Sequence, residues 1–193
     1  MKIFYWSPFI SKVATVSSVI RSAESILKYS KKKNNINVAI IDAIGEWKNY
    51  RKIINPKIEI INLSKKNISE SLPKVGFFKS RLSYALIFAL TFFKLLNLIN
   101  KEKPDYIIAH LLTSLPIFLT LIIKNKTKVI IRISGLPKLN FARYIFWKLF
   151  SKKIYRVTCP TTLTYEYLKK INIFDQNKLF VLRDPVIKLH EFL

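Results

Sequence analysis

Short apolar runs alternate with longer helical patterns along the whole chain. Each run holds four to seven mostly hydrophobic residues without a regular polar face, which predicts a strand buried on both sides of a parallel sheet. Seven runs fit this description: Lys2–Trp6, Asn37–Asp42, Lys57–Leu63, Asp105–His110, Lys128–Ile133, Ile154–Thr158 and Leu179–Leu182.

Helices are predicted in most of the intervals between these runs. The first is amphipathic, because Val16, Val19, Ile20, Ala23, Ile26 and Leu27 recur at helical spacing. Further helices are predicted at Phe77–Asn100, from Ser114 to about Lys124, from an N-cap at Asn140 through Lys152, and at Thr161–Lys170. Two polar stretches, Lys31–Asn35 and Ser64–Lys74, are predicted to be loops.

This alternation predicts an α/β fold, a doubly wound, mostly parallel Rossmann-like sheet with helices on both faces. In such sheets ligands bind outside the carboxyl ends of the strands. The chemistry is therefore sought in the segments that follow strands: Ser7–Lys12, Ala43–Trp47, His110–Thr113, Ser134–Lys138 and Pro160–Thr162.

The net charge narrows the class of partner. Among 193 residues, 34 Lys and Arg face 11 Asp and Glu, giving a formal charge of +23. Such an excess favours anionic lipid, phosphorylated ligands or nucleic acid. A biased, Lys-rich composition is the alternative explanation, because the lysines are spread along the chain. No RNA- or DNA-binding signature is present, so no nucleic-acid partner is expected.

The sequence lacks the motifs that several classes of protein require. With only Gly45, Gly76 and Gly135, the chain has neither a dinucleotide fingerprint nor a phosphate-binding P-loop. A single cysteine, Cys159, excludes an internal disulfide and a cysteine-cluster metal site. Because only two histidines are present, no metal and no cofactor are expected.

A few residues at strand ends are candidates for ligand binding. His110 ends a predicted strand at the ligand-binding edge, where it contacts a ligand or serves as a structural histidine. Arg132 suits bidentate phosphate binding, or pairs with an acid within the domain. Ser134 and Gly135 follow it in the turn, and Gly135 permits close backbone approach or positive φ.

Two segments mix cations with aromatic residues. They are Lys74–Arg81 and Phe141–Lys153, and such surfaces are attracted to anionic bilayers. The predicted membrane-contact residues are Lys74, Lys79, Arg81, Arg143, Trp147, Lys148, Lys152 and Lys153. An ordinary helix with a solvated basic face is the alternative. The run Leu82–Ile99 contains only Lys94 as a charge, and favours a buried or membrane-surface helix over a membrane span.

The order of these elements resembles the N-terminal, acceptor-side domain of family 4 glycosyltransferases, which have the GT-B fold. The matching segments are Lys2–Ser7, Lys103–His110, Lys128–Gly135, Val157–Thr161 and Lys178–Ile187. The resemblance covers nearly the whole chain. It implies sugar transfer from a nucleotide-sugar to a lipid-linked or cell-envelope glycan acceptor, in the cytoplasm on the inner face of the cytoplasmic membrane.

The same resemblance divides the chain into two parts. Residues 1–185 correspond to the acceptor-side domain, and residues 186–193 to a hinge toward a C-terminal donor domain. In this family the donor domain holds the nucleotide-sugar, so the 193 residues are expected to be inactive alone. The resemblance also assigns acceptor binding to Ser7, Lys12, His110, Arg132, Ser134 and Gly135. The alternative is a non-catalytic Rossmann-like module that docks on an anionic membrane or on a separate donor-domain subunit.

Overall fold

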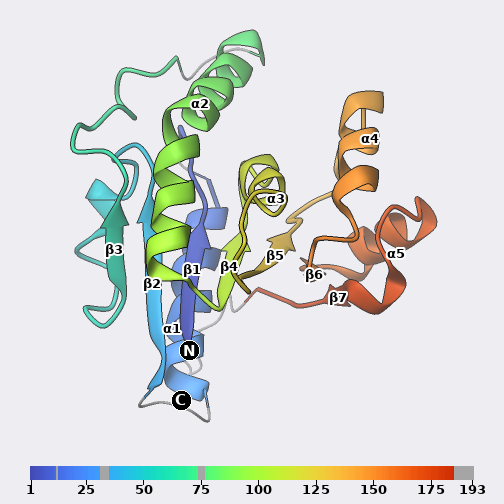
Figure 1. Ribbon diagram of the computed structural model, residues 1–193, viewed down its shortest axis with the longest axis horizontal. Helices are drawn as coiled ribbons and strands as arrows, with labels where there is room; N and C mark the ends of the chain where they lie inside the picture. Colours follow the sequence, from blue (N-terminus) through green and yellow to red (C-terminus); the bar gives the residue numbers. More distant parts are fainter. Residues whose placement is uncertain (12, 31–34, 74–76, 185–193) are drawn as a thin grey trace.

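Seven strands form a single sheet in the computed structural model, which describes residues 1–11, 13–30, 35–73 and 77–184 (Figure 1). The predicted site residues Lys12 and Lys74 and the predicted hinge at 186–193 lie outside the described residues.

All described strand pairs are parallel, and their order across the sheet is β3-β2-β1-β4-β5-β6-β7. This confirms the predicted α/β class and doubly wound topology. The strands are β1 (Lys2–Trp6), β2 (Asn37–Asp42), β3 (Glu59–Asn62), β4 (Tyr106–Ala109), β5 (Lys128–Arg132), β6 (Arg156–Cys159) and β7 (Leu179–Val181).

The helices fall where the pattern predicts them. They are α1 (Thr15–Tyr29), α2 (Phe77–Glu102), α3 (Ser114–Leu119), α4 (Phe141–Phe150) and α5 (Thr162–Lys170), with short 3₁₀ turns η2 (Lys48–Tyr50) and η3 (Gln176–Lys178). The predicted N-cap is confirmed, because Asn140 Oδ1 accepts a 2.9 Å hydrogen bond from the backbone nitrogen of Arg143.

Helix α3 is shorter than predicted. It ends at Leu119, because the hydroxyl of Thr120 donates to the carbonyl of Ile117 at 2.6 Å and the backbone continues in tighter turns. The apolar residues beyond it, Leu121 and Ile122, are exposed and are not part of the helix.

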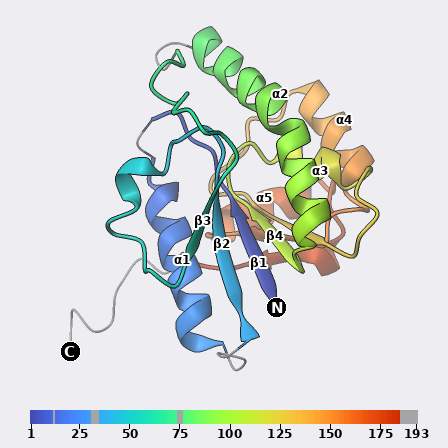
Figure 2. The ribbon, with the colours of Figure 1, turned by 60° about the vertical axis from the view of Figure 1, so that its left-hand side comes forward.

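The two faces of the sheet are covered unequally. Helix α1 packs on one face, against Ile3 and Tyr5 of β1, whereas α2, α3, α4 and α5 pack on the other (Figure 2). Right-handed crossovers explain this division, because the chain moves outward from β1 in one direction through α1 and in the other through α3, α4 and α5.

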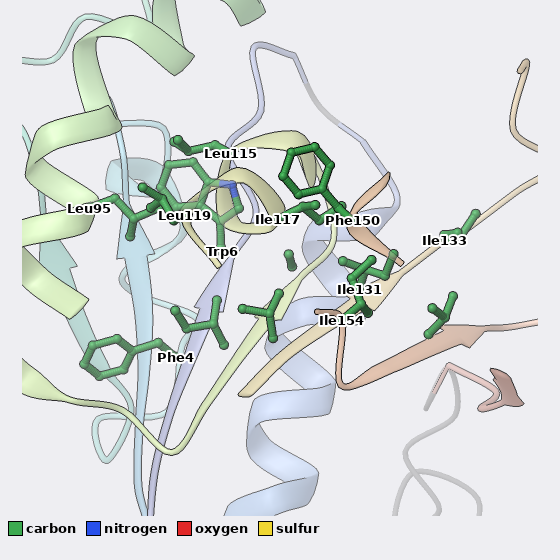
Figure 3. Packing of buried hydrophobic residues seen from close by; sticks show 14 of the residues in the cluster. Phe4, Trp6, Leu95, Leu115, Ile117, Leu119, Ile131, Ile133, Phe150 and Ile154 are labelled. Carbon is green, nitrogen blue, oxygen red and sulfur yellow. The ribbon is translucent and has the colours of Figure 1, made fainter. Parts of the chain in front are cut away.

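The larger core lies between the sheet and the four helices. Phe4 and Trp6 of β1 point into it beside Leu95 of α2 and Leu115 of α3 (Figure 3). The Phe118 ring of α3 lies 6.0 Å from Phe92 of α2 and 6.1 Å from Phe150 of α4, between ring centroids. Helix α3 therefore lies between α2 and α4 and joins them into one apolar layer.

Beyond α1, the first face stays uncovered by the described residues. Tyr106, Ile108 and Ile130 on this side of β4 and β5 are only half-buried, and Phe180 of β7 is 38% exposed. Parallel sheets normally have both faces covered, so this bare face is unusual.

The loop after β2 generates a stability prediction. Gly45 has φ +92°, and a Cβ added there would lie 2.7 Å from Asn67 Oδ1 and 2.9 Å from Asn67 Cα. Replacing Gly45 by Ala is expected to reduce the free energy of unfolding by about 1–3 kcal/mol, through strain and the close contact. Urea denaturation measures this. Gly135→Ala is the matched control, because a Cβ there meets nothing within 4 Å. Equal losses in the two variants would contradict the assignment of strain to the loop.

Candidate functional site

The order of the strands reverses at the centre of the sheet, between β1 and β4. Strand β1 pairs with both β2 and β4, and a doubly wound sheet binds ligands at the carboxyl ends of such a pair. Ser7 follows β1 and His110 follows β4, with the backbone nitrogen of His110 donating to the Trp6 carbonyl at 2.9 Å. Two residues predicted from strand ends thus lie at the switch point.

Buried polar atoms without partners are concentrated in the predicted site residues. Among the described residues, the Ser7 hydroxyl, both ring nitrogens of His110 and the Arg132 Nε are buried without a hydrogen-bond partner. The indole nitrogen of Trp47 shares this property, beside the rings of Phe9 and Tyr50. Buried polar groups are nearly always paired, so this concentration marks a place where a bound molecule would supply the missing partners.

His110 is held in its neutral form. Burial lowers the pKa of its imidazole to about 3, and the nearby positive charge of Arg132 acts in the same direction. Neutral imidazole offers one N–H donor and one nitrogen acceptor. Its ring lies 5.9 Å from that of Tyr5, whose hydroxyl is occupied by a 2.7 Å hydrogen bond with Ser22.

Arg132 has an internal acidic partner. One of its terminal nitrogens, Nη2, donates to the Asp184 carboxylate at 2.5 Å and to the Leu182 carbonyl at 2.8 Å. This pairing confirms the salt-bridge alternative raised by the sequence. Because the two partners lie 52 residues apart, only the fold brings them together. The contact anchors the segment that follows β7 beside the ends of β4 and β5.

His110 and Arg132 line the same cavity, on the uncovered sheet face next to α1. Its volume is about 690 Å³. The wall contains Ile3, Ile108 and Ile130 from the sheet and Ser22, Ser25 and Ile26 from α1. A volume of this size is within the range of small-molecule sites.

The remaining predicted acceptor residues lie apart from this cavity. Ser134 and Gly135 are exposed in the turn that follows β5. The proposed reason for Gly135 is wrong, because it has no positive φ and a side chain there would meet open space. Ser7 is fully buried and does not line the cavity. Of the predicted acceptor residues described, the cavity brings together His110 and Arg132.

A second hollow of about 430 Å³ lies at the carboxyl ends of β1 and β2. Its lining includes Phe9, Glu46 and Tyr50. The Glu46 carboxylate accepts from the backbone nitrogens of Ala43 and Ile44, and burial beside Asp42 raises its pKa. The acid pair was not singled out from the sequence. The signal was Asp42 followed four residues later by Glu46, around the turn at Gly45.

Apolar side chains project from the outer surfaces of α2 and α4. On α2, Leu82, Leu86, Leu90 and Phe93 are 56%, 39%, 44% and 70% exposed. On α4, Phe141, Ile145 and Leu149 are 80%, 38% and 71% exposed. We call these rows the α2 ridge and the α4 ridge. Their spacing of three or four residues places each row along one side of its helix.

Trp147 was wrongly predicted to contact a membrane. It is 6% exposed, and its ring packs 5.4 Å from that of Phe174 on the inner side of α4. The error came from treating the whole aromatic segment as one surface. In the helix, Ile145 and Leu149 are exposed, whereas Trp147 lies on the opposite side and points to the core. The described cations predicted for membrane contact are exposed: Lys79, Arg81, Arg143, Lys148, Lys152 and Lys153.

Helix α2 meets the length and composition of a membrane span. The segment Lys79–Glu102 has 24 residues, and its most apolar stretch of 18 residues has a mean hydropathy of 1.9 and is 28% buried. One such helix is weak evidence for a span, because core helices of soluble proteins meet the same criterion. The described residues contain no group of three or more His, Cys, Asp or Glu residues that could hold a metal ion.

No protein-family model and no curated protein sequence matches this chain. Solved structures do resemble it. UDP-GlcNAc 2-epimerase from Neisseria meningitidis, bound to UDP-GlcNAc, aligns with a TM-score of 0.56 and 19% identity, over 94% of this chain and 46% of the epimerase. The lipopolysaccharide outer core galactosyltransferase WaaB in its apo form aligns with a TM-score of 0.56 and 12% identity, over 96% and 46%.

A third solved structure also resembles the chain. The UGT transferase from Siraitia grosvenorii, in complex with UDP, aligns with a TM-score of 0.58 and 7% identity, over 98% of this chain and 52% of the transferase. At these identities the likeness concerns the fold alone. The chain spans about half the length of the solved structures it matches, and its fold is one Rossmann-like half of a GT-B architecture.

The buried, neutral His110 generates a pH prediction. Its pKa is about 3 in the folded chain and about 6.5 when exposed, so the unfolded state binds more protons between these values. Stability is therefore expected to fall as pH drops from about 7 toward 3, by up to about 1.4 kcal/mol per pH unit from this residue. His110→Gln should lack this part of the slope. Urea denaturation of both proteins at several pH values measures it, and parallel curves would contradict a buried neutral histidine.

Proposed function

We propose that the chain is the acceptor-side domain of a glycosyltransferase that transfers a sugar from a nucleotide-sugar to a lipid-linked or cell-envelope glycan acceptor. His110 and Arg132 contact the acceptor, and Ser7, Lys12, Ser134 and Gly135 belong to the loops around it. The donor is bound by a C-terminal domain that the 193 residues do not include. The chain alone is inactive in this proposal.

One observation carries the proposal. The family resemblance assigned acceptor binding to Ser7, His110 and Arg132, which lie at the ends of predicted strands. All three have buried polar atoms without partners in the described structure. Two of them flank the switch point where ligands bind in doubly wound sheets. An acceptor hydroxyl or phosphate in the cavity would supply the missing hydrogen bonds of His110 and Arg132.

The solved structures support a sugar-nucleotide context. Those that resemble the chain include a galactosyltransferase and enzymes in complex with UDP or UDP-GlcNAc. Each is about twice as long as the part that aligns, which supports a role as one half of a two-domain enzyme. Transferases and epimerases share this fold, so the fold does not distinguish the two activities. We propose sugar transfer because of the acceptor site.

The ridges support a location on a membrane. The α2 ridge and the α4 ridge lie on the two helices that α3 joins, and exposed Arg143, Lys148 and Lys152 accompany the α4 ridge. Apolar rows flanked by cations suit the surface of an anionic bilayer. We therefore place the protein in the cytoplasm, peripherally on the inner face of the cytoplasmic membrane.

The same ridges favour a second function. A non-catalytic Rossmann-like module would dock through them on an anionic membrane, or on a separate donor-domain subunit. In that case the loss of His110 or Arg132 would leave its activity in the cell unchanged, whereas a transferase would lose activity.

The 193-residue chain is expected to show no sugar transfer by itself. Purified protein is incubated with a panel of nucleotide-sugars and a cell-envelope lipid extract, and radiolabelled product is measured. Transfer is expected only when a C-terminal donor domain is added or joined. His110→Ala in the joined protein is the control for the acceptor site. Turnover by the isolated chain that disappears in its own His110→Ala variant would refute the division into halves.

Binding to anionic vesicles is expected to depend on α4. Replacing Arg143 and Lys152 by Glu removes two surface cations, each contributing about 1 kcal/mol, so binding should weaken at least about 30-fold. Vesicle sedimentation at low salt measures it. Lys124→Glu with Lys126→Glu changes the net charge equally, at exposed positions just before β5. Equal loss in the two variants would indicate attraction by net charge and not by the α4 surface.

A further inference from the structure

We infer that the cavity beside α1 binds an aliphatic chain that ends in an anionic oxygen group, with the anionic group at His110 and Arg132. A fatty-acid carboxylate and a lipid phosphate both have this chemistry. The inference rests on the proposed function in one respect only: the bound aliphatic chain would be the lipid part of the sugar acceptor. The binding itself follows from the shape and the polarity of the cavity.

The cavity runs along the strands. Tyr106, Ile108 and His110 line it in succession on β4, and Ile130 and Arg132 follow the same direction on β5. At a rise of about 3.3 Å per residue, the strip from Tyr106 to His110 is about 13 Å long, the extended length of about ten carbons. The cavity is therefore elongated. Isoleucines line it along the strands, and His110 and Arg132 lie at its carboxyl end.

The part toward the amino ends of the strands is mostly apolar, with Ser25, Ser30 and Arg156 as its polar lining. Ile3, Ile26, Ile108 and Ile130 face it, and the Tyr5 hydroxyl beneath is already bonded to Ser22. A sugar or a nucleotide base placed there would leave most of its polar atoms unpaired, at a cost that an aliphatic chain avoids. Burying the same isoleucines under a hydrocarbon instead removes apolar surface from water.

The part toward the carboxyl ends is polar and short of acceptors. Arg132 Nε and one His110 nitrogen are donors without partners among the described residues, and both residues are at least 95% buried. Arg183 adds positive charge to this part, and Asp184 is the one acid in the described lining. Arg156 lies farther toward the amino ends of the strands, in register with Ile130. Because Asp184 occupies only Nη2 of Arg132, an anionic oxygen group would find donors that no protein group uses.

The charge of the cavity also selects against neutral chains. An alcohol oxygen could accept hydrogen bonds from both donors, but it is uncharged and would not offset the buried charge of Arg132 beyond what Asp184 already does. A phosphate or carboxylate brings both charge and two or more acceptor oxygens. Binding should therefore require the chain and the anionic group together.

Isothermal titration with short amphiphiles tests this, at concentrations below micelle formation and with the full chain. Decyl phosphate and decanoate are the probes, and decanol and inorganic phosphate each lack one half of the chemistry. The expected result is one ligand per chain for at least one probe, with decanol and inorganic phosphate weaker by tenfold or more. The ratio of the affinities for decyl phosphate and decanoate distinguishes a lipid phosphate from a fatty acid as the preferred ligand.

Variants decide whether the binding is in the cavity. Ser25→Trp fills it from α1 and Ile130→Trp fills it from β5, so each should reduce affinity at least tenfold, provided that urea denaturation shows a folded protein. His110→Leu keeps the space but removes the polar end, and should weaken the anionic probes more than decanol. Ile122→Trp is the matched control, because Ile122 is 41% exposed beyond α3 and does not line the cavity.

Two outcomes would overturn the inference. If Ile122→Trp and the cavity variants bind the probes equally, the amphiphiles bind the exposed ridges. If no probe binds up to its micelle concentration, the cavity does not bind an aliphatic anion. Neither outcome touches the proposed sugar transfer, whose acceptor would then be a glycan, whereas activity of the isolated chain would refute the division into halves and leave the cavity untouched.

Discussion

The handedness of the crossovers determines most of this structure. A parallel sheet that starts at its centre, with β1, has to place α1 on one face and the helices after β4 on the other. The same rule therefore creates the switch point between β1 and β4, the thick layer of α2, α3 and α4, and the bare face beside α1. Site, core and cavity are consequences of a single geometric constraint.

Arg132 is the electrostatic centre of the candidate site. Its buried charge is paired with Asp184 and helps to keep His110 neutral. A neutral imidazole can donate one hydrogen bond and accept another, and it does not add a second positive charge beside the guanidinium. The arrangement thus combines one fixed positive charge with one adaptable polar group, on strands that are held rigidly by their neighbours.

The sequence allowed the strands and helices to be predicted, because buried parallel strands and amphipathic helices have different periods. His110 and Arg132, both chosen at strand ends, line the same cavity. The features that could not be predicted depend on contacts that form only in the folded chain. The partner of Arg132 is 52 residues away, the inward direction of Trp147 depends on Phe174, and the acids at Asp42 and Glu46 meet only around a turn. The cavity could not be predicted, since it lies on a sheet face where the described part of the chain places no helix besides α1.

The central position of β1 also has a kinetic side. It is the first strand to leave the ribosome, yet its pairing with β4 joins Ile3 to Tyr106, about 100 residues later. At about 5–20 residues per second, translation alone separates the two by about 5–20 s. During that interval α2 is made with its apolar ridge and without the strand that completes the sheet centre. A chain of this topology has a high contact order and is exposed to association while it is being synthesised.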